Sequence, residues 1–161
     1  MKFKYCPKCS CLDLTMKGKD YLCESCGFMF WQNSKPTVTA SIVKNGKVLL
    51  AKRSIDPYRG YWDLPGGFLN DGESPEVGLK REMKEELGVE IKIKKFIGVF
   101  IDKFKDQGDW YSALCLHYLC EIIKGEPLPL EEASELKWFK IKDLPKNISY
   151  KSNRKVLKLL K

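Results

Sequence analysis

Residues 64–89, with the sequence LPGGFLNDGESPEVGLKREMKEELGV, join a glycine turn to a strongly acidic predicted helix. Ser74 is a favoured N-cap residue, and the proline that follows it is a favoured first helical residue. The pattern therefore predicts a helix over 75–87 that Gly88 ends. This stretch constrains the fold more than any other, because it fixes a turn, a helix and the faces of that helix together.

Three glutamates of this helix point to one side. At about 100° per residue, Glu82, Glu85 and Glu86 fall within roughly a 100° arc of the helix surface. Like charges this close destabilise a bare helix, and a stable fold tolerates them when a cation neutralises the cluster. Carboxylate oxygens suit Mg²⁺ or Mn²⁺, and the absence of neighbouring histidines argues against zinc here. A merely solvated acidic face is the alternative, which the preceding Gly66-Gly67 turn argues against.

Other positions of the helix have distinct expected roles. Arg81 lies four residues before Glu85 on the same side, so it is expected to hold that carboxylate in place. Gly78 costs about 1 kcal/mol relative to alanine inside a helix, which indicates close approach by another backbone or by a ligand. The apolar stripe expected to anchor the helix to a sheet consists of Leu79, Met83 and Leu87.

The spacing of these residues resembles the Nudix box, the signature of Mg-dependent hydrolases acting on nucleoside diphosphates linked to another group. The resemblance implies that Glu82, Glu85 and Glu86 bind metal together with the carbonyl of Gly67. It also implies that Glu82 and Glu85 are catalytic, that Arg81 orients the cluster and that Glu73 supports the loop through hydrogen bonds. The matching positions are Gly67, Glu73 and the run Arg81-Glu82-Met83-Lys84-Glu85-Glu86-Leu87-Gly88-Val89.

A second acidic segment, Glu131-Glu132-Ala-Ser-Glu135, precedes a Trp-Phe strand and resembles an acidic loop of the same family. In the NADH diphosphatase branch, a metal-linked glutamate lies six residues before that aromatic residue. Counting back from Trp138 gives Glu132, the candidate catalytic base, and Glu135 is the weaker candidate. Some family members use a motif glutamate as the base instead. In that alternative, both loop acids are simply solvated side chains.

Four of the seven cysteines form a metal-binding pattern. Residues 1–10 lack the apolar region of a secretory signal, so metal binding is expected rather than disulfides. Cys6-x-x-Cys9 and Cys23-x-x-Cys26 each suit a tight knuckle, and together they supply four thiolates for tetrahedral zinc. Residues 1–32 are too few to bury a useful core, so zinc would supply their folding free energy. The unit resembles a zinc ribbon. A redox Cys-x-x-Cys is the rival, but it usually occurs singly beside a βαβ pattern.

The remaining cysteines and the single histidine are expected to have no direct role in chemistry. Cys11 is either a replacement for Cys9 as a ligand or a spare thiol, and the spare thiol is favoured. Cys115 and Cys120 lie in an apolar strand and are expected to pack. His117 lies in the same alternating strand and is expected to be structural.

From Pro36 the pattern changes to short strands and a final helix. Asn45-Gly46 is a strong hairpin turn signal between two of the strands. The class predicted is α+β, with a mixed sheet, the motif helix on one face and the terminal helix on the other. The resemblance implies that residues 36–161 form a Nudix α/β/α sandwich after the ribbon. Strands are predicted at 37–43, 47–53, 90–98, 111–123 and 136–140, and the final helix at 152–160.

The sequence indicates the substrate less clearly than the type of reaction. A zinc ribbon ahead of a Nudix domain resembles the NADH diphosphatase branch, which cleaves NADH, NAD, related dinucleotides or NAD-capped RNA. That branch carries a Ser-Gln-Pro-Trp-Pro-Phe-Pro run, whereas residues 106–112 here read DQGDWYS. The ADP-ribose branch commonly has a proline where this chain has Lys105. Stacking on a base is expected of Tyr58, Phe100 and Trp110, with Phe104 and Tyr111 nearby, and ordinary packing is the alternative.

The leading hypothesis is a Mg²⁺- or Mn²⁺-dependent hydrolase that splits NADH-, NAD- or ADP-ribose-type compounds and releases a nucleoside monophosphate. The alternatives are a nucleoside triphosphate diphosphatase that cleans the nucleotide pool and a non-catalytic module that senses nucleotides or binds RNA.

The net charge of +8 rests on 29 basic residues, of which four are arginines. These basic residues are expected to form a solvated surface, with RNA as a candidate partner. No apolar run reaches the roughly 20 residues of a membrane span, so a cytoplasmic protein is expected. A homodimer is compatible with the resemblance.

Overall fold

The larger sheet is mixed and has seven strands among the described residues. The computed structural model describes residues 3–106, 108–130 and 132–161. Strands β4 and β9 run parallel and the other pairs are antiparallel, which confirms the predicted mixed sheet. The main path is β10 (Ala133–Lys140), β5 (Lys47–Arg53), β4 (Lys35–Lys44), β9 (Asp109–Lys124) and β8 (Glu90–Asp106). The short strands β6 (Trp62–Asp63) and β7 (Gly66–Phe68) pair with β5 and β4.

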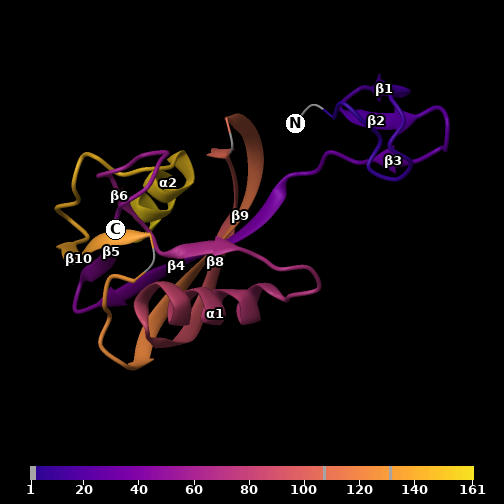
Figure 1. Cartoon of the computed structure of the whole chain (residues 1–161). Helices are drawn as coiled ribbons and strands as arrows, with labels where there is room; N and C mark the ends of the chain where they lie inside the picture. Colours follow the sequence, from indigo (N-terminus) through magenta and orange to yellow (C-terminus); the bar gives the residue numbers. More distant parts are fainter. Residues whose placement is uncertain (1–2, 107, 131) are drawn as a thin grey trace.

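One helix covers each face of this sheet (Figure 1). α1 (Pro75–Leu87) packs on alternate residues of β4, and α2 (Lys151–Leu159) packs on the other face. The α1 cluster includes Val38, Ala40, Ile42, Leu79, Met83 and Leu87, and the α2 cluster includes Val48, Leu50, Ile148, Val156 and Leu157. Burial of each large side chain stabilises the fold by about 1.5–3 kcal/mol. The predicted sandwich is confirmed. No helix in the described part of the chain is long and apolar enough to span a bilayer.

α1 begins and ends where the sequence predicts. Ser74 holds the N-cap position with an extended backbone (φ −73°, ψ 150°), but its side chain makes no cap hydrogen bond, and a proline occupies the first helical position. Gly88 ends it in the left-handed conformation (φ 69°), and its N–H donates to the carbonyl of Lys84 at 3.0 Å. Glycine adopts this conformation at no steric cost, so the cap fixes the helix end that carries the glutamates.

The β8–β9 hairpin is longer than predicted. The sequence suggests a strand that stops at Gly98, but β8 continues to Asp106 and pairs with β9 as far as Asp109. Gly98 lies at an irregularity in the register of the two strands, so this glycine marks a bulge rather than a strand end. β10 also starts earlier than predicted, at Ala133, and α2 starts one residue earlier, at Lys151.

The N-terminal residues form a separate three-stranded antiparallel sheet. In Figure 1 this unit lies apart from the large sheet and is joined to it through the start of β4. Phe3 packs edge-on against Tyr21 and Phe30, with ring centroids 5.4 and 4.7 Å away. Such a small apolar contact leaves much of the folding free energy to another source. The strands are β1 (Leu14–Lys17), β2 (Asp20–Cys23) and β3 (Met29–Phe30).

Candidate active site

A cleft of about 840 Å³ opens beside the glutamate face of α1. Its walls come from α1, α2, the large sheet and the loop before β10, so segments distant in sequence meet there. The acidic residues that line it are Asp56, Asp63, Glu82, Glu85, Glu86, Asp102 and Glu132. The three predicted metal-binding glutamates of the helix thus share one cavity with the candidate base.

Arg81 connects the carboxylates on the α1 side of the cleft. Its Nη1 donates to Oε1 of Glu82 at 2.7 Å and to Oε2 of Glu85 at 2.8 Å. Its Nε and Nη2 donate to the two carboxylate oxygens of Glu73, each at 2.9 Å, and Nη2 also donates to the carbonyl of Phe68. The expected contact between Arg81 and Glu85 is present, and the same guanidinium holds two further acids.

Glu73 joins the loop after β7 to the helix. Hydrogen bonds from Arg81, and then from the N–H of Asn70, lower the pKa of Glu73 to about 2, so its carboxylate is ionised at neutral pH. Together with Leu69, Glu73 also accounts for Gly78. A Cβ at Gly78 would meet the side chains of Leu69 and Glu73. The close approach inferred from the sequence is therefore made by side chains and not by another backbone.

The Gly66-Gly67 turn lies directly against the glutamates. Glu82 is buried, and a Cβ at Gly67 would collide with its carboxylate. Gly66 has φ +147°, and a Cβ there would collide with the carbonyl of Val38 in β4. Glycine at both positions therefore lets β7 pair with β4 while the turn touches the helix.

Glu86 faces the same turn. Its Oε2 accepts a hydrogen bond from the N–H of Gly66 at 2.8 Å. Burial raises the pKa of Glu86 to about 8, and the charges of Glu82, Asp63 and Glu132 act in the same direction against the Gly66 N–H. Negative charge gathered in a partly dry site is stabilised by a cation, and the all-oxygen donor set suits Mg²⁺ or Mn²⁺.

Glu132 reaches the cleft from the loop before β10. Its carbonyl accepts hydrogen bonds from both the N–H and the hydroxyl of Ser54, at 2.8 and 2.7 Å. Glu131 of the same acidic segment lies outside the described residues. Glu135 pairs with Lys52 at 3.3 Å and is not among the described residues that line the cleft. Of the two loop acids considered from the sequence, Glu132 is the one at the cavity.

A charged pair that the sequence analysis missed lies at the cleft floor. Arg53 Nη1 donates to Asp63 Oδ2 at 3.0 Å, and Arg53 Nε donates to the carbonyl of Pro57 at 2.8 Å. Asp63 also accepts a hydrogen bond from the side-chain amide of Asn153 in α2. Burial raises the pKa of Asp63 while Arg53 opposes that rise. The sequence does offer one sign of this pair. Asp63 stands between the apolar Trp62 and Leu64, and a charge that is buried with such neighbours is usually paired.

The three aromatic residues expected to stack on a base do not lie together. Trp110 is 54% exposed, and Phe100 packs edge-on against His117 with a centroid distance of 5.4 Å. Tyr58 packs against Tyr61 and Tyr150, at 5.6 and 5.0 Å. None of the three expected residues is among the described residues that line the cleft.

A different aromatic group borders the cleft. Phe68 and Phe104 line it, with ring centroids 4.8 Å apart. Tyr111 stacks behind Phe104 at 5.3 Å and an interplanar angle of 22°, and the Lys35 ammonium lies 5.3 Å from the Tyr111 ring centroid. These four residues, here called the aromatic wall, come from β7, β8, β9 and β4. Phe104 and Tyr111 were noted in the sequence, but Phe68 was not.

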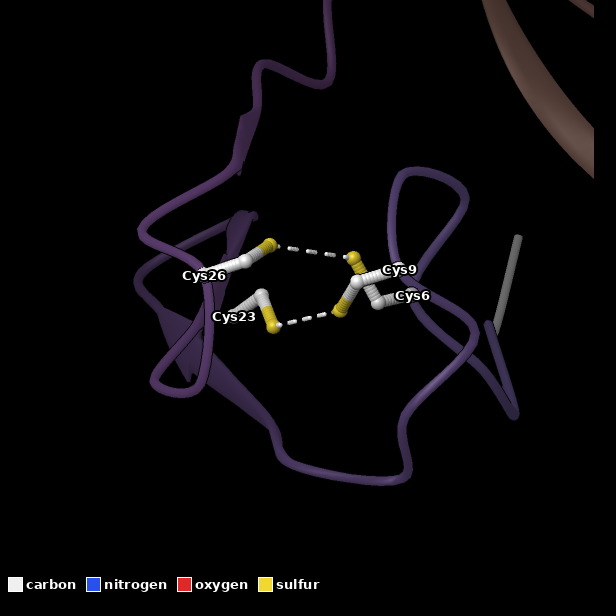
Figure 2. Close-up of side chains that lie close together, drawn as sticks. All are labelled: Cys6, Cys9, Cys23 and Cys26. Atoms are coloured by element: carbon white, nitrogen blue, oxygen red, sulfur yellow. Dashed lines mark hydrogen bonds between the residues drawn. The ribbon is translucent and has the colours of Figure 1, made fainter.

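Four cysteine thiols meet in the N-terminal unit (Figure 2). The Sγ atoms of Cys6, Cys9, Cys23 and Cys26 all lie within 4.8 Å of one another. The Cys6–Cys26 and Cys9–Cys23 distances are both 3.7 Å. Sulfurs around a tetrahedral zinc with bonds of about 2.3 Å lie about 3.8 Å apart. The arrangement therefore fits zinc and supports the small ribbon expected from the sequence.

The other cysteines differ in position. Cys11 Sγ lies 3.2 Å from that of Cys9 and 3.3 Å from that of Cys23, so this fifth thiol is beside the cluster. Cys120 is buried in β9 within the α1 cluster, which confirms its expected packing role, whereas Cys115 is buried in the same strand and lines the cleft. Burial raises the pKa of Cys120 to about 12, so its thiol is unreactive at neutral pH.

Known proteins share this fold and sequence pattern. A family model of the NUDIX domain matches residues 34–160. An ADP-ribose pyrophosphatase of Methanocaldococcus jannaschii is 35% identical over 109 residues, covering 68% of this chain and 63% of that protein. An NAD-capped RNA hydrolase, NudC, of Pseudomonas aeruginosa is 29% identical over 147 residues, covering 88% of this chain and 49% of that protein. The crystal structure of a NUDIX hydrolase from Nitrosomonas europaea has a TM-score of 0.81 at 27% identity, covering 97% of this chain and 89% of that one.

The sandwich, the glycine turn and the glutamate helix all fall within the part that the family model matches. The protein belongs to the Nudix hydrolase family, and its N-terminal cysteine cluster supports a small zinc ribbon ahead of the Nudix domain. The chain spans less than two thirds of the length of the two curated relatives described above.

Proposed function

We propose that this protein is a Mg²⁺- or Mn²⁺-dependent hydrolase of the diphosphate linkage in NADH-, NAD- or ADP-ribose-type compounds, and that it releases a nucleoside monophosphate. The observation that carries the proposal is the order of residues along the extended segment 62–68. Asp63 pairs with Arg53 at one end, the central glycines touch Glu82 and Glu86, and Phe68 belongs to the aromatic wall. The glutamates thus lie between two chemically different surfaces, as a diphosphate with a group at each end requires.

Glu82, Glu85 and Glu86, with the carbonyl of Gly67, are the residues that would hold the divalent ion. Their oxygen donors suit Mg²⁺ or Mn²⁺. Burial first, and then the neighbouring carboxylates, raise the pKa of Glu86, and a bound cation would oppose both effects by favouring its ionised form. A bound ion of this kind neutralises the diphosphate, stabilises the leaving phosphate and lowers the pKa of the attacking water.

The other acidic and basic residues have separate roles in the proposal. Arg81 keeps Glu82 and Glu85 in fixed positions through hydrogen bonds of 2.7 and 2.8 Å. Glu73 keeps Arg81 in place. Glu132 accepts the proton of the attacking water, because this residue lines the cleft and its backbone carbonyl is held by Ser54.

Two relatives support the class of substrate. One is named an ADP-ribose pyrophosphatase and another an NAD-capped RNA hydrolase. ADP-ribose and NAD both contain a nucleoside diphosphate joined to a second group. The aromatic wall supports a planar base at one end of the substrate, since the Phe104 ring borders the cleft and Tyr111 stacks behind it at 5.3 Å.

We also propose that the cysteine cluster, namely Cys6, Cys9, Cys23 and Cys26, holds a structural zinc ion. The sulfur spacing of 3.7 Å in both cross pairs supports this ion. Four thiolates would close its coordination shell, so this zinc stabilises the fold and takes no part in hydrolysis.

The test is turnover of a nucleotide panel by the full chain with Mg²⁺. NADH, NAD, ADP-ribose and nucleoside triphosphates are incubated separately, and the products are resolved by ion-exchange chromatography. We expect AMP from the dinucleotides or ADP-ribose, and no product in the presence of a chelator. Pyrophosphate released from triphosphates alone would support the pool-cleaning alternative. Tight nucleotide binding without turnover of any compound would overturn the enzyme proposal.

A further inference from the structure

A second hollow lies on α2 and the segment before it, and it shares no lining residue with the active-site cleft. Its volume is about 400 Å³. Apolar residues line part of it, among them Leu144, Ile148 and Leu157, of which the last two are buried. None of its described lining residues is acidic. The basic residues that line it are Lys146, Lys151, Arg154, Lys155, Lys158 and Lys161, here called the lysine hollow.

The described acidic residues do not balance the charge of the lysine hollow. Residues 144–161 contain five lysines and one arginine without any aspartate or glutamate. In the described residues, no aspartate or glutamate side chain forms an ion pair with these six side chains. Arg154 Nη1 donates to the carbonyls of Ile148, at 2.6 Å, and Ser149, at 2.5 Å, which fixes its guanidinium beside the hollow.

The helix holds these cations in an unfavourable arrangement. Lys151, Arg154, Lys155 and Lys158 are spaced three and four residues apart, so like charges are neighbours on one side of α2. Lys151 is in the first turn, where the helix dipole disfavours a cation, and that turn has no acidic residue. The opposite side of the helix is buried, so the basic residues face outward. A polyanion would relieve the repulsion.

We propose that the lysine hollow binds the phosphodiester chain of a single-stranded polynucleotide, RNA and DNA alike. The stripe from Lys151 to Lys158 is about 10 Å long, so it can meet successive phosphates. Lysine contacts a phosphate as a point charge, without reading a base. None of the described lining residues is aromatic, so the contacts are to phosphates and not to stacked bases, and phosphate contacts carry no sequence information. A flexible strand enters a concave site, whereas a membrane surface is flat. This surface acts independently of the proposed hydrolysis.

The test is fluorescence anisotropy of the full chain with a labelled oligouridylate and with the matching DNA, over a series of salt concentrations. The variant Lys151→Gln/Lys155→Gln/Lys158→Gln should bind about ten-fold more weakly at low salt. Its slope of log affinity against log salt should fall by about 2, since each lost phosphate contact removes about 0.7. The matched control Lys92→Gln/Lys94→Gln/Lys95→Gln removes the same charge from β8 and should bind as the parent does.

The pair Lys146→Gln/Lys161→Gln lies outside α2 and repeats the test without disturbing the helix. Its slope should fall by about 1.4. Equal losses in the α2 and β8 variants would show attraction to the net charge alone and overturn the proposal. It would also be overturned if the parent bound neither polynucleotide at low salt, or bound only anionic phospholipid vesicles or polyglutamate. Thermal melting of each variant establishes that it is folded.

Discussion

The guanidinium of Arg81 donates to both carboxylate oxygens of Glu73, with Nε–Oε1 and Nη2–Oε2 distances of 2.9 Å. This pairing leaves Nη1 to hold Glu82 and Glu85. The positions of two proposed metal ligands therefore depend on a carboxylate outside the proposed metal site. Such supporting residues commonly influence metal affinity nearly as much as the ligands do.

Replacement of Glu73 by glutamine should weaken metal-dependent activity. An amide offers one acceptor oxygen, so Arg81 loses one of its paired hydrogen bonds and the glutamates it holds become less ordered. We expect a loss of roughly 10–100-fold in activity at limiting Mg²⁺. Hydrolysis rates over a Mg²⁺ titration measure it. Glu90→Gln is the control, since Glu90 pairs with the exposed Lys124 on the far strands. An unchanged titration for Glu73→Gln would contradict the supporting role.

Gly67→Ala should destabilise the protein, because the new methyl group would collide with the Glu82 carboxylate. Overpacking of this kind typically costs about 1–3 kcal/mol in the free energy of unfolding. Urea denaturation of the single variants and of Gly67→Ala/Glu82→Ala measures it. The shorter side chain at position 82 should remove most of the cost of the new methyl group. Simple addition of the two single effects would be evidence against the contact.

The buried His117 should make the fold sensitive to acid. Its ring nitrogens have no hydrogen-bond partner among the described residues, and burial lowers its pKa to about 4. An unfolded histidine has a pKa of about 6.5, so the unfolded state binds more protons between these values. Stability should therefore fall as the pH is lowered from about 6.5 to about 4, by about 3 kcal/mol in total.

Urea denaturation across this pH range compares the parent with His117→Leu, which has no titrating group at that position. The difference in unfolding free energy between the two proteins isolates the contribution of the histidine from that of carboxylates that titrate in the same pH range. Curves that stay parallel from neutral pH to about 4 would exclude His117 as the source of the acid sensitivity.

Removal of zinc should unfold residues 1–32 and leave the sandwich folded. The N-terminal unit has one small aromatic contact around Phe3, whereas the sandwich has two apolar clusters of its own. Hydrogen exchange before and after chelation, with measurement of released zinc, tests this. Cys9→Ser should lose the ion and Cys11→Ser should keep it. Unchanged exchange with no zinc released would count against the ribbon.

Local signals in the sequence predicted the parts of the structure that depend on local contacts. The ends of α1 follow from Pro75 and Gly88, each of which acts within one helical turn, whereas the Ser74 side chain makes no cap hydrogen bond. The cysteine cluster follows from two short spacings. By contrast, Asp63 meets Asn153 across a separation of 90 residues, and no local pattern encodes that contact.

The aromatic residues near the cleft show a second limit of sequence reasoning. Phe100 and Phe104 are both on β8 and alternate in the same phase, so both face one side of the sheet. Phe100 packs against the α2 cluster, whereas Phe104 lies beyond it and borders the cleft. The strand pattern gives the face of a side chain but not which neighbouring element covers it.

The central claim is that the acidic face of α1 performs metal-dependent diphosphate hydrolysis. Its most direct test is the rate of AMP release from NADH and ADP-ribose at saturating Mg²⁺, for the parent, Glu85→Gln and Glu121→Gln. The Glu85 side chain is 45% exposed, so its replacement leaves the core intact, and Glu121 is a matched exposed acid that pairs with Lys94. We predict a fall of about 100-fold or more for Glu85→Gln and no change for Glu121→Gln. Equal rates for all three proteins would contradict the account.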